Sequence, residues 1–60
     1  MKIYVVQDVS GGLESNLEYV GTDKNKAFSY TPEVLEGADV EITTWEDGIQ
    51  IDYVLLQSED

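Results

Sequence analysis

The chain has 60 residues, no cysteine and a formal net charge of −10 at pH 7, from 13 acidic side chains and three basic ones. This length allows one domain over residues 1–60, which buries only about 60% of the surface of the unfolded chain. The lack of cysteine excludes a disulfide framework, a zinc–thiolate site and a thiol nucleophile, and it fits a reducing, cytoplasmic location. No apolar run approaches the length of a membrane span.

The negative charge is concentrated in the second half of the chain. Residues 1–30 hold four acids and all three lysines, whereas residues 31–60 hold nine acids and no base. A surface of this sign repels nucleic acids and anionic membranes and attracts basic proteins. We therefore expect a basic protein as partner, and no direct binding to nucleic acid or to a membrane.

The first third of the chain predicts two strands joined by a loop. Residues 2–9 (KIYVVQDV) are rich in β-branched and aromatic side chains, which suit a strand. The Ser-Gly-Gly sequence at 10–12 indicates a loop with a mobile tip. Residues 17–20 predict a short second strand, so that the two strands form an N-terminal hairpin.

Residues 22–36 predict one kinked helix or two short ones. Thr22 is a candidate helix N-cap, and residues 24–30 form the first helical stretch. The Thr-Pro-Glu sequence at 31–33 is a second start signal, because proline suits the first helical position and cannot continue a preceding helix. Gly37 is a natural stop. The side chains expected to face the sheet are Ala27, Phe28, Tyr30, Val34 and Leu35.

Residues 39–56 predict a β-hairpin around a two-residue turn, Asp47-Gly48, because a type I′ turn needs positive φ at both central positions. A regular register from this turn pairs Glu46 with Ile49 and Thr44 with Ile51, and continues with the pairs Ile42–Tyr53 and Val40–Leu55. One face is then a core face of Val40, Ile42, Thr44, Ile49, Ile51, Tyr53 and Leu55. The opposite face is acidic and carries one tryptophan; its residues are Glu41, Thr43, Trp45, Gln50, Asp52 and Val54.

The order of elements is β-β-α-β-β. It predicts an α+β fold with a four-stranded antiparallel sheet and one short or kinked helix packed on one face. Residues 57–60 predict a frayed acidic tail.

The sequence does not indicate catalysis. There is no histidine to act as a base near neutral pH, no cysteine nucleophile, and no histidine partner for the serines. Glu41 and Asp52 are expected to lie close together, but a domain of this size has little room for a pocket that would raise the pKa of a carboxylate. We predict that the protein is not an enzyme.

Metal and cofactor sites are not indicated either. The acids around the predicted hairpin turn do not continue an EF-hand loop, and alternate strand residues do not wrap around an ion. The glycine pair at 11–12 lacks the lysine and the following helix of a phosphate-binding loop. We therefore expect no metal and no cofactor.

The acidic second half is the main functional signal. The hypothesis is that its acids imitate the charge of duplex DNA, about one charge per 1.7 Å of axis, and block a protein that binds nucleic acid. The alternative is that the charge only keeps the protein soluble and monomeric. The predicted partner-binding residues are Glu33, Glu36, Asp39, Glu41, Trp45, Glu46, Asp47 and Asp52.

Trp45 strengthens the binding hypothesis. On the predicted acidic face it resembles the aromatic centre of an interface with a polar rim. Two other interpretations remain open: the helix packs on that face, or Trp45 covers Val54.

Two stretches, residues 2–6 (KIYVV) and 21–30 (GTDKNKAFSY), resemble small phage and bacterial proteins in which a strand is followed by a short lysine-containing helix and then an acidic strand. In size and charge the chain is similar to phage-encoded inhibitors of host enzymes, including anti-CRISPR proteins and DNA mimics. The resemblance implies an inhibitor or regulator of a host protein, acting in the bacterial cytoplasm. It implies no functional residue.

A hypothesis of a different class is a small interaction or assembly module that works by apolar contact or by pairing of strand edges. In one form of this hypothesis the protein is a homodimer, which would enlarge the small core. The effect of salt on binding distinguishes the acidic inhibitor from the assembly module, since electrostatic binding weakens steeply with ionic strength and edge pairing does not.

Overall fold

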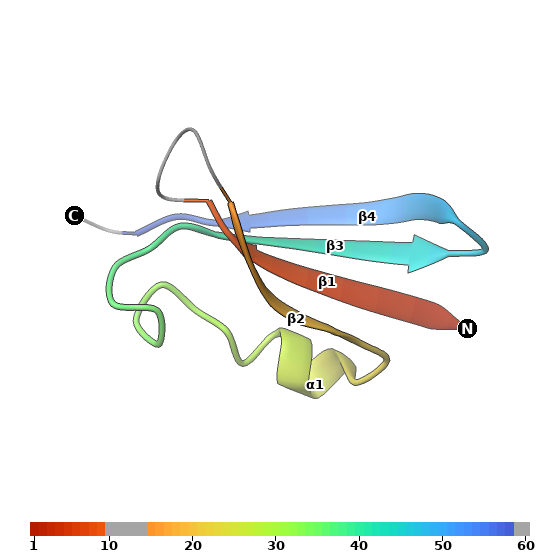
Figure 1. Cartoon of the computed structure of the whole chain (residues 1–60), viewed down its shortest axis with the longest axis horizontal. Helices are drawn as coiled ribbons and strands as arrows, with labels where there is room; N and C mark the ends of the chain where they lie inside the picture. Colours follow the sequence, from red (N-terminus) through yellow and green to blue (C-terminus); the bar gives the residue numbers. More distant parts are fainter. Residues whose placement is uncertain (10–14, 59–60) are drawn as a thin grey trace.

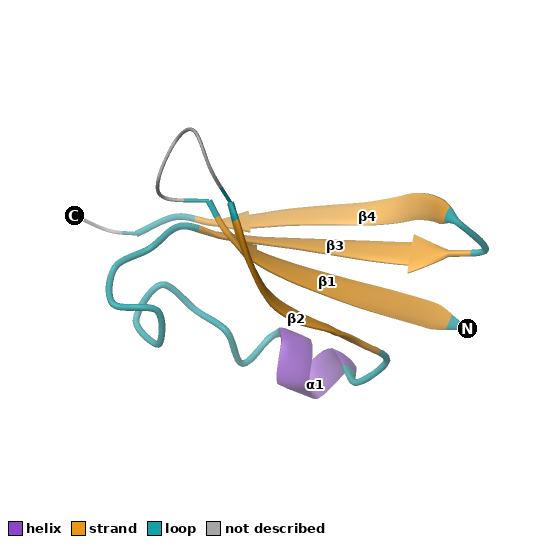
Figure 2. Cartoon of the chain, viewed as in Figure 1, coloured by secondary structure: helices purple, strands orange, loops and turns teal. Residues whose placement is uncertain are grey.

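The computed structural model describes residues 1–9 and 15–58. Four strands and one helix follow the predicted order: β1 (Lys2–Asp8), β2 (Asn16–Gly21), α1 (Lys24–Ala27), β3 (Val40–Glu46) and β4 (Ile49–Leu56). Figure 1 shows their path, and Figure 2 shows the strands as one layer with the helix beside it. The loop predicted from the Ser-Gly-Gly sequence at 10–12 and the last two residues of the predicted tail lie outside the described residues.

The four strands form one antiparallel sheet in the order β2-β1-β3-β4. Two hairpins, β1–β2 and β3–β4, therefore join through the central pair β1–β3, and β2 and β4 are the edges. The α+β prediction with ββαββ order is confirmed.

α1 and the segment that follows it cover one face of the sheet. This face is here called the helix side. Its buried core comprises Tyr4, Val6, Ala27, Val40 and Ile42, and the partly buried side chains packed against it are Tyr19, Phe28, Tyr30, Leu35, Val54 and Leu56. Phe28 meets Tyr4 edge to face at 6.5 Å, and Tyr30 stacks on Tyr19 at 6.1 Å, measured between ring centroids. The predicted inward positions of Ala27, Phe28, Tyr30 and Leu35 are confirmed. The prediction for Val34 is wrong, because this side chain is exposed.

The helical segment is shorter than predicted. Asp23, rather than Thr22, is the N-cap, and its Oδ1 accepts a hydrogen bond from the Lys26 amide at 3.1 Å. The helix ends after one turn, and residues 32–37 form turns. Glu36 and Gly37 both have positive φ, 58° and 91°, which a right-handed helix cannot accommodate. The second helical stretch of the prediction is therefore wrong.

The hairpin turn is as predicted. Asp47 and Gly48 have φ of 53° and 78°, as a type I′ turn requires, and Glu46 pairs with Ile49. The next pairs show a β-bulge: Trp45 pairs with Gln50 and Thr44 with Asp52, so that Ile51 is the extra residue on β4.

The bulge shifts the rest of the hairpin by one residue. Ile42 pairs with Val54 and Val40 with Leu56, so the predicted pairs Thr44–Ile51, Ile42–Tyr53 and Val40–Leu55 are wrong. Because side chains alternate along a strand, this shift places Asp52, Val54 and Leu56 on the helix side and moves Tyr53 and Leu55 to the opposite face. The bulge thus decides which of the two alternating sets of β4 side chains faces the core.

Candidate functional site

The sheet face opposite α1, here called the open face, is not covered by any element within residues 1–9 and 15–58. The strand register places its side chains in three rows across the sheet: Ile3–Trp45–Gln50, Val20–Val5–Thr43–Tyr53 and Leu17–Gln7–Glu41–Leu55. Leu17, Val20, Tyr53 and Leu55 are exposed large apolar or aromatic side chains. The open face is therefore mainly apolar, with polar groups at a few positions.

The prediction of an acidic hairpin face is wrong. Of the residues that the register places on the open face, only Glu41 is charged. Asp52 lies on the helix side, since it pairs with Thr44, and is therefore on the opposite face from Glu41. Sequence reasoning missed Tyr53 and Leu55 as members of the open face, because no local signal in β4 marks the bulge at Ile51.

Trp45 lies on the open face, and Val54 does not, so the interpretation that the indole covers Val54 is excluded. The core lies on the other face, which also excludes packing of α1 on Trp45. Its Nε1 donates a hydrogen bond to Thr43 Oγ1 at 2.9 Å, which holds the indole back along its own strand. Thr43 is only 7% exposed although no described element covers this face, and Trp45 is half-buried. The centre of the open face is thus a fixed aromatic surface.

Tyr53 and Glu41 form the polar contact of this face. The Tyr53 hydroxyl donates a hydrogen bond to Glu41 Oε2 at 3.2 Å. The pKa of the Tyr53 phenol is raised by partial desolvation first, and then by the negative charge of Glu41 and the hydrogen bond to it. The phenol is therefore a neutral donor at physiological pH, and it orients the one carboxylate of the open face.

The other predicted acids do not form one array with Glu41. Glu33 and Glu36 are exposed in the turns before β3, and Asp39 precedes this strand. Glu46 is the last residue of β3 and Asp47 is the first residue of the hairpin turn, so both lie at the other end of this strand. Seven strand residues span about 20 Å, so the acids form two groups at opposite ends of the hairpin.

Asp39 has a structural contact. Its Oδ1 accepts a hydrogen bond from the Ser58 amide at 2.8 Å, so the chain is attached beside β3 just after β4 ends.

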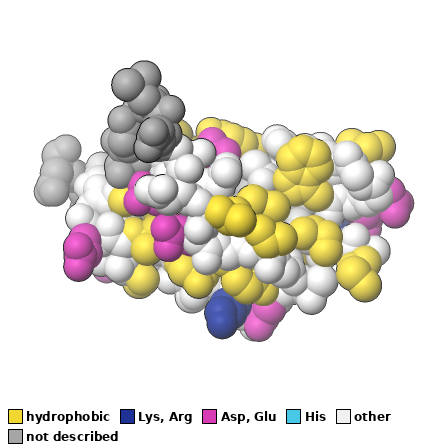
Figure 3. All heavy atoms as spheres, viewed as in Figure 1, with side chains coloured by type: hydrophobic (Ala, Val, Ile, Leu, Met, Phe, Trp, Pro, Cys, Tyr) yellow, Lys and Arg dark blue, Asp and Glu magenta, His cyan; other side chains and the backbone are white. Residues whose placement is uncertain are grey.

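The lysines lie on the other side of the molecule. Lys24 and Lys26 extend from α1 over the rings of Phe28 and Tyr19, each 5.9 Å from the centroid, and Lys2 is on the helix side by its pairing with Glu46. In the view of Figure 3, hydrophobic side chains reach the surface over the strands, and Asp and Glu lie mostly toward the ends and margins. The charge is therefore distributed unevenly: the three lysines lie on the helix side, whereas Glu41 lies on the open face.

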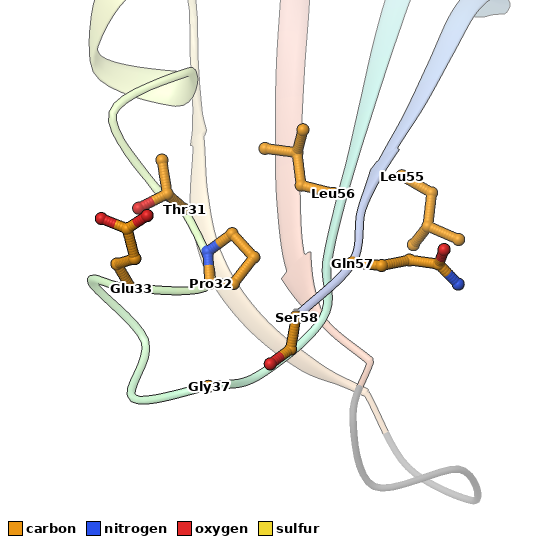
Figure 4. A pocket seen from close by; sticks show the side chains of 8 residues that line it. All are labelled: Thr31, Pro32, Glu33, Gly37, Leu55, Leu56, Gln57 and Ser58. Carbon is orange, nitrogen blue, oxygen red and sulfur yellow. The ribbon is translucent and has the colours of Figure 1, made fainter. Parts of the chain in front are cut away.

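A cleft of about 590 Å³ lies between the turn at 31–37 and the end of β4. In Figure 4, Leu56 and Ser58 point toward the turn that carries Thr31 and Pro32, whereas Leu55 and Gln57 point away from it. Its lining offers hydroxyl groups and the Glu33 carboxylate, with no pair of groups suited to nucleophilic or acid–base catalysis.

Within the described part of the chain, no three of His, Cys, Asp and Glu come together in a way that could hold a metal ion. None of the described helices is long and apolar enough to cross a membrane.

The fold and the site together define an α+β protein. One face of its sheet is covered, and the other face is apolar and has no cover from the described residues. Comparison with models of protein families, with curated proteins and with solved structures found no match for this chain.

Proposed function

We propose that this protein is a non-enzymatic acidic binding protein that inhibits or regulates a basic, nucleic-acid-binding protein, and that it contacts this partner through the open face. The observation that carries the proposal is the exposed apolar surface in a chain of net charge −10, above all Leu17 and Val20, which are 61% and 52% exposed. Contiguous apolar surface of this kind marks interaction sites on small soluble proteins.

The acids and the open face have different parts in this proposal. Acids at both ends of the hairpin attract a positively charged surface over a distance, as a DNA mimic does, and raise the rate of association. The apolar centre with Trp45 then supplies most of the affinity, since the buried centre of an interface is apolar and aromatic and its rim is polar. This combination of acids and an apolar centre suits a partner protein whose surface normally binds phosphates.

The charge also argues against the homodimer interpretation. Two copies that meet through their open faces bring together two chains of −10 each, with no lysine on either face to offset the repulsion. A basic partner turns the same charge into an attraction.

The test is capture from a bacterial lysate on the immobilised protein, with elution in a salt gradient and identification by mass spectrometry. The test variant is Leu17→Gln with Val20→Gln, which removes exposed apolar surface from the open face. Val34→Gln is the matched control, because Val34 is 60% exposed and lies in the turns outside the sheet.

We expect one basic, nucleic-acid-binding protein on the wild type and on the Val34 variant, and its loss from the double variant. Equal retention by all three proteins would contradict a role for the open face. A broad set of basic proteins that leaves at low salt would mean that the charge acts only in solubility.

A further inference from the structure

β4 is an edge strand, and its outer side pairs with no other strand of the described residues. In the sheet formed by the described strands its single neighbour is β3. Unpaired N–H and C=O groups along such an edge can accept another strand, and natural proteins usually protect long edges with lysine or proline. The eight residues of β4 include neither, and Asp52 is the single charge among them.

The exposed apolar side chains of β4 lie on both faces of the sheet. Tyr53 and Leu55 belong to the open face. Ile49 pairs with Glu46 on the helix side, and Ile51 lines a hollow there together with Phe28. These four side chains are between 41% and 66% exposed.

This distribution favours one mode of binding. A partner that docks flat on the open face covers Tyr53 and Leu55 but leaves both isoleucines in water. An added strand has side chains on alternate faces, so it lies beside all four residues and also pairs the free backbone groups of the edge.

The charges around β4 indicate the chemistry of such a strand. On the open side of the edge, Glu41 lies beside Tyr53, and Asp47 is at the hairpin turn. On the helix side, Asp52 shares a hollow with Lys2 and Lys24, and Glu46 pairs with Lys2, so the acids of that side have lysine neighbours. The opposite edge, β2, lies next to the lysines of α1, with Lys26 over the Tyr19 ring. A basic strand is therefore attracted to the open side of β4, where Glu41 lies, and the lysines of α1 disfavour the same strand at β2.

We propose that the outer edge of β4 accepts an extended, lysine- or arginine-containing segment of the partner as a fifth strand, with a cation on the face that lies on the open side, toward Glu41. This inference rests on the proposed function, since it gives the basic partner its mode of binding. A second copy of this chain is a poor occupant, because its own β4 would bring another Asp52 and no cation.

The first experiment uses a peptide of eight residues in which Lys-Lys and Val-Val alternate, so that each face of the extended peptide carries both types. The full-length ¹⁵N-labelled protein is titrated with it, and amide hydrogen exchange is measured for each strand. The controls are the same peptide with an N-methyl group on every residue, which removes the backbone N–H donors along both edges of the peptide, and its Glu-for-Lys counterpart.

We expect exchange in Ile49–Leu56 to slow at least tenfold with the lysine peptide, and to stay unchanged with both controls. Three results would overturn the edge proposal: no protection of β4 at millimolar peptide, equal protection of β2, or protection by the N-methylated peptide.

The second experiment separates this proposal from the proposed function. Ile51→Lys adds a cation to the β4 edge and leaves the open face intact, whereas the double variant at Leu17 and Val20 alters the open face and leaves the β4 edge intact. Val34→Lys is the control for added charge. With the captured partner, we expect Ile51→Lys to lower affinity at least tenfold and Val34→Lys less than twofold.

If Ile51→Lys binds like the control while the double variant does not bind, the edge proposal fails and the proposed function stands. If the double variant binds like the wild type, the proposed function fails whatever the β4 variant does.

Discussion

The Tyr53 hydroxyl donates a hydrogen bond to the Glu41 carboxylate at 3.2 Å, across the pair of strands β3 and β4. The two side chains meet only because the bulge at Ile51 moves Tyr53 to the open face, where Glu41 already lies. This contact is a consequence of the shifted register, and it can be measured in solution.

The pKa of Tyr53 reports this contact. Desolvation, the charge of Glu41 and the hydrogen bond together raise this pKa. We expect Glu41→Gln to lower it, because the charge disappears, while Glu46→Gln leaves it unchanged. Spectrophotometric titration of phenolate formation measures the Tyr53 pKa in both variants, and Tyr53→Phe assigns the signal. An unchanged titration in Glu41→Gln would show that the Tyr53 hydroxyl and the Glu41 carboxylate do not meet in solution.

The raised pKa of Tyr53 makes the free energy of unfolding depend on pH. A raised pKa in the folded state favours the neutral phenol, so this contribution is complete below about 10, the ordinary pKa of tyrosine, and is lost as the pH rises through the folded-state value. We expect wild-type stability to fall more steeply than that of Glu41→Gln above this pH. Urea unfolding at a series of alkaline pH values tests the difference, and parallel curves would contradict it.

A pair of neighbouring substitutions tests the register of β4. Val54 is half-buried against the core, whereas Leu55 is exposed on the open face. We expect Val54→Asn to lower the free energy of unfolding by about 1–3 kcal/mol, because a polar amide replaces an apolar contact. Leu55→Asn should change it by less than about 0.5 kcal/mol. Chemical denaturation of both variants measures the two losses of stability. The regular register without a bulge requires the larger loss in Leu55→Asn.

The N-cap of α1 offers a second matched pair. Asp23 accepts the Lys26 amide, and Thr22 is exposed beside it without the role of cap. We expect Asp23→Ala to cost about 1 kcal/mol of stability, since it leaves a backbone donor at the helix start without its partner. Thr22→Ala should have a smaller effect. Thermal unfolding of the two variants measures this, and an equal loss would assign the cap to neither residue.

The oligomeric state should depend on salt. Because the open faces of two copies repel each other, we expect a monomer at low ionic strength, with self-association only where salt screens the charge. Sedimentation velocity over a range of salt concentrations tests this. A dimer that persists at low salt would favour the assembly module over the acidic binding protein.

The sequence by itself determined the order of strands and helix, the hairpin turn and the uneven charge. Each of these depends on local chemistry: Asp47 and Gly48 tolerate positive φ, and the charge is a matter of composition. The cap of α1 was missed by one residue because Thr22 and Asp23 are both good capping residues, and only the backbone conformation chooses between them.

The face of β4 was decided only by the tertiary structure. Its sequence, IQIDYVLL, has apolar residues at alternate positions in both phases, since Ile51, Tyr53 and Leu55 alternate with Val54 and Leu56. Local alternation therefore supports either register, and contact of Val54 and Leu56 with the core under α1 selects one of them at the expense of a bulge. That choice also assembles the open face, because it places Tyr53 and Leu55 beside Glu41 and Trp45.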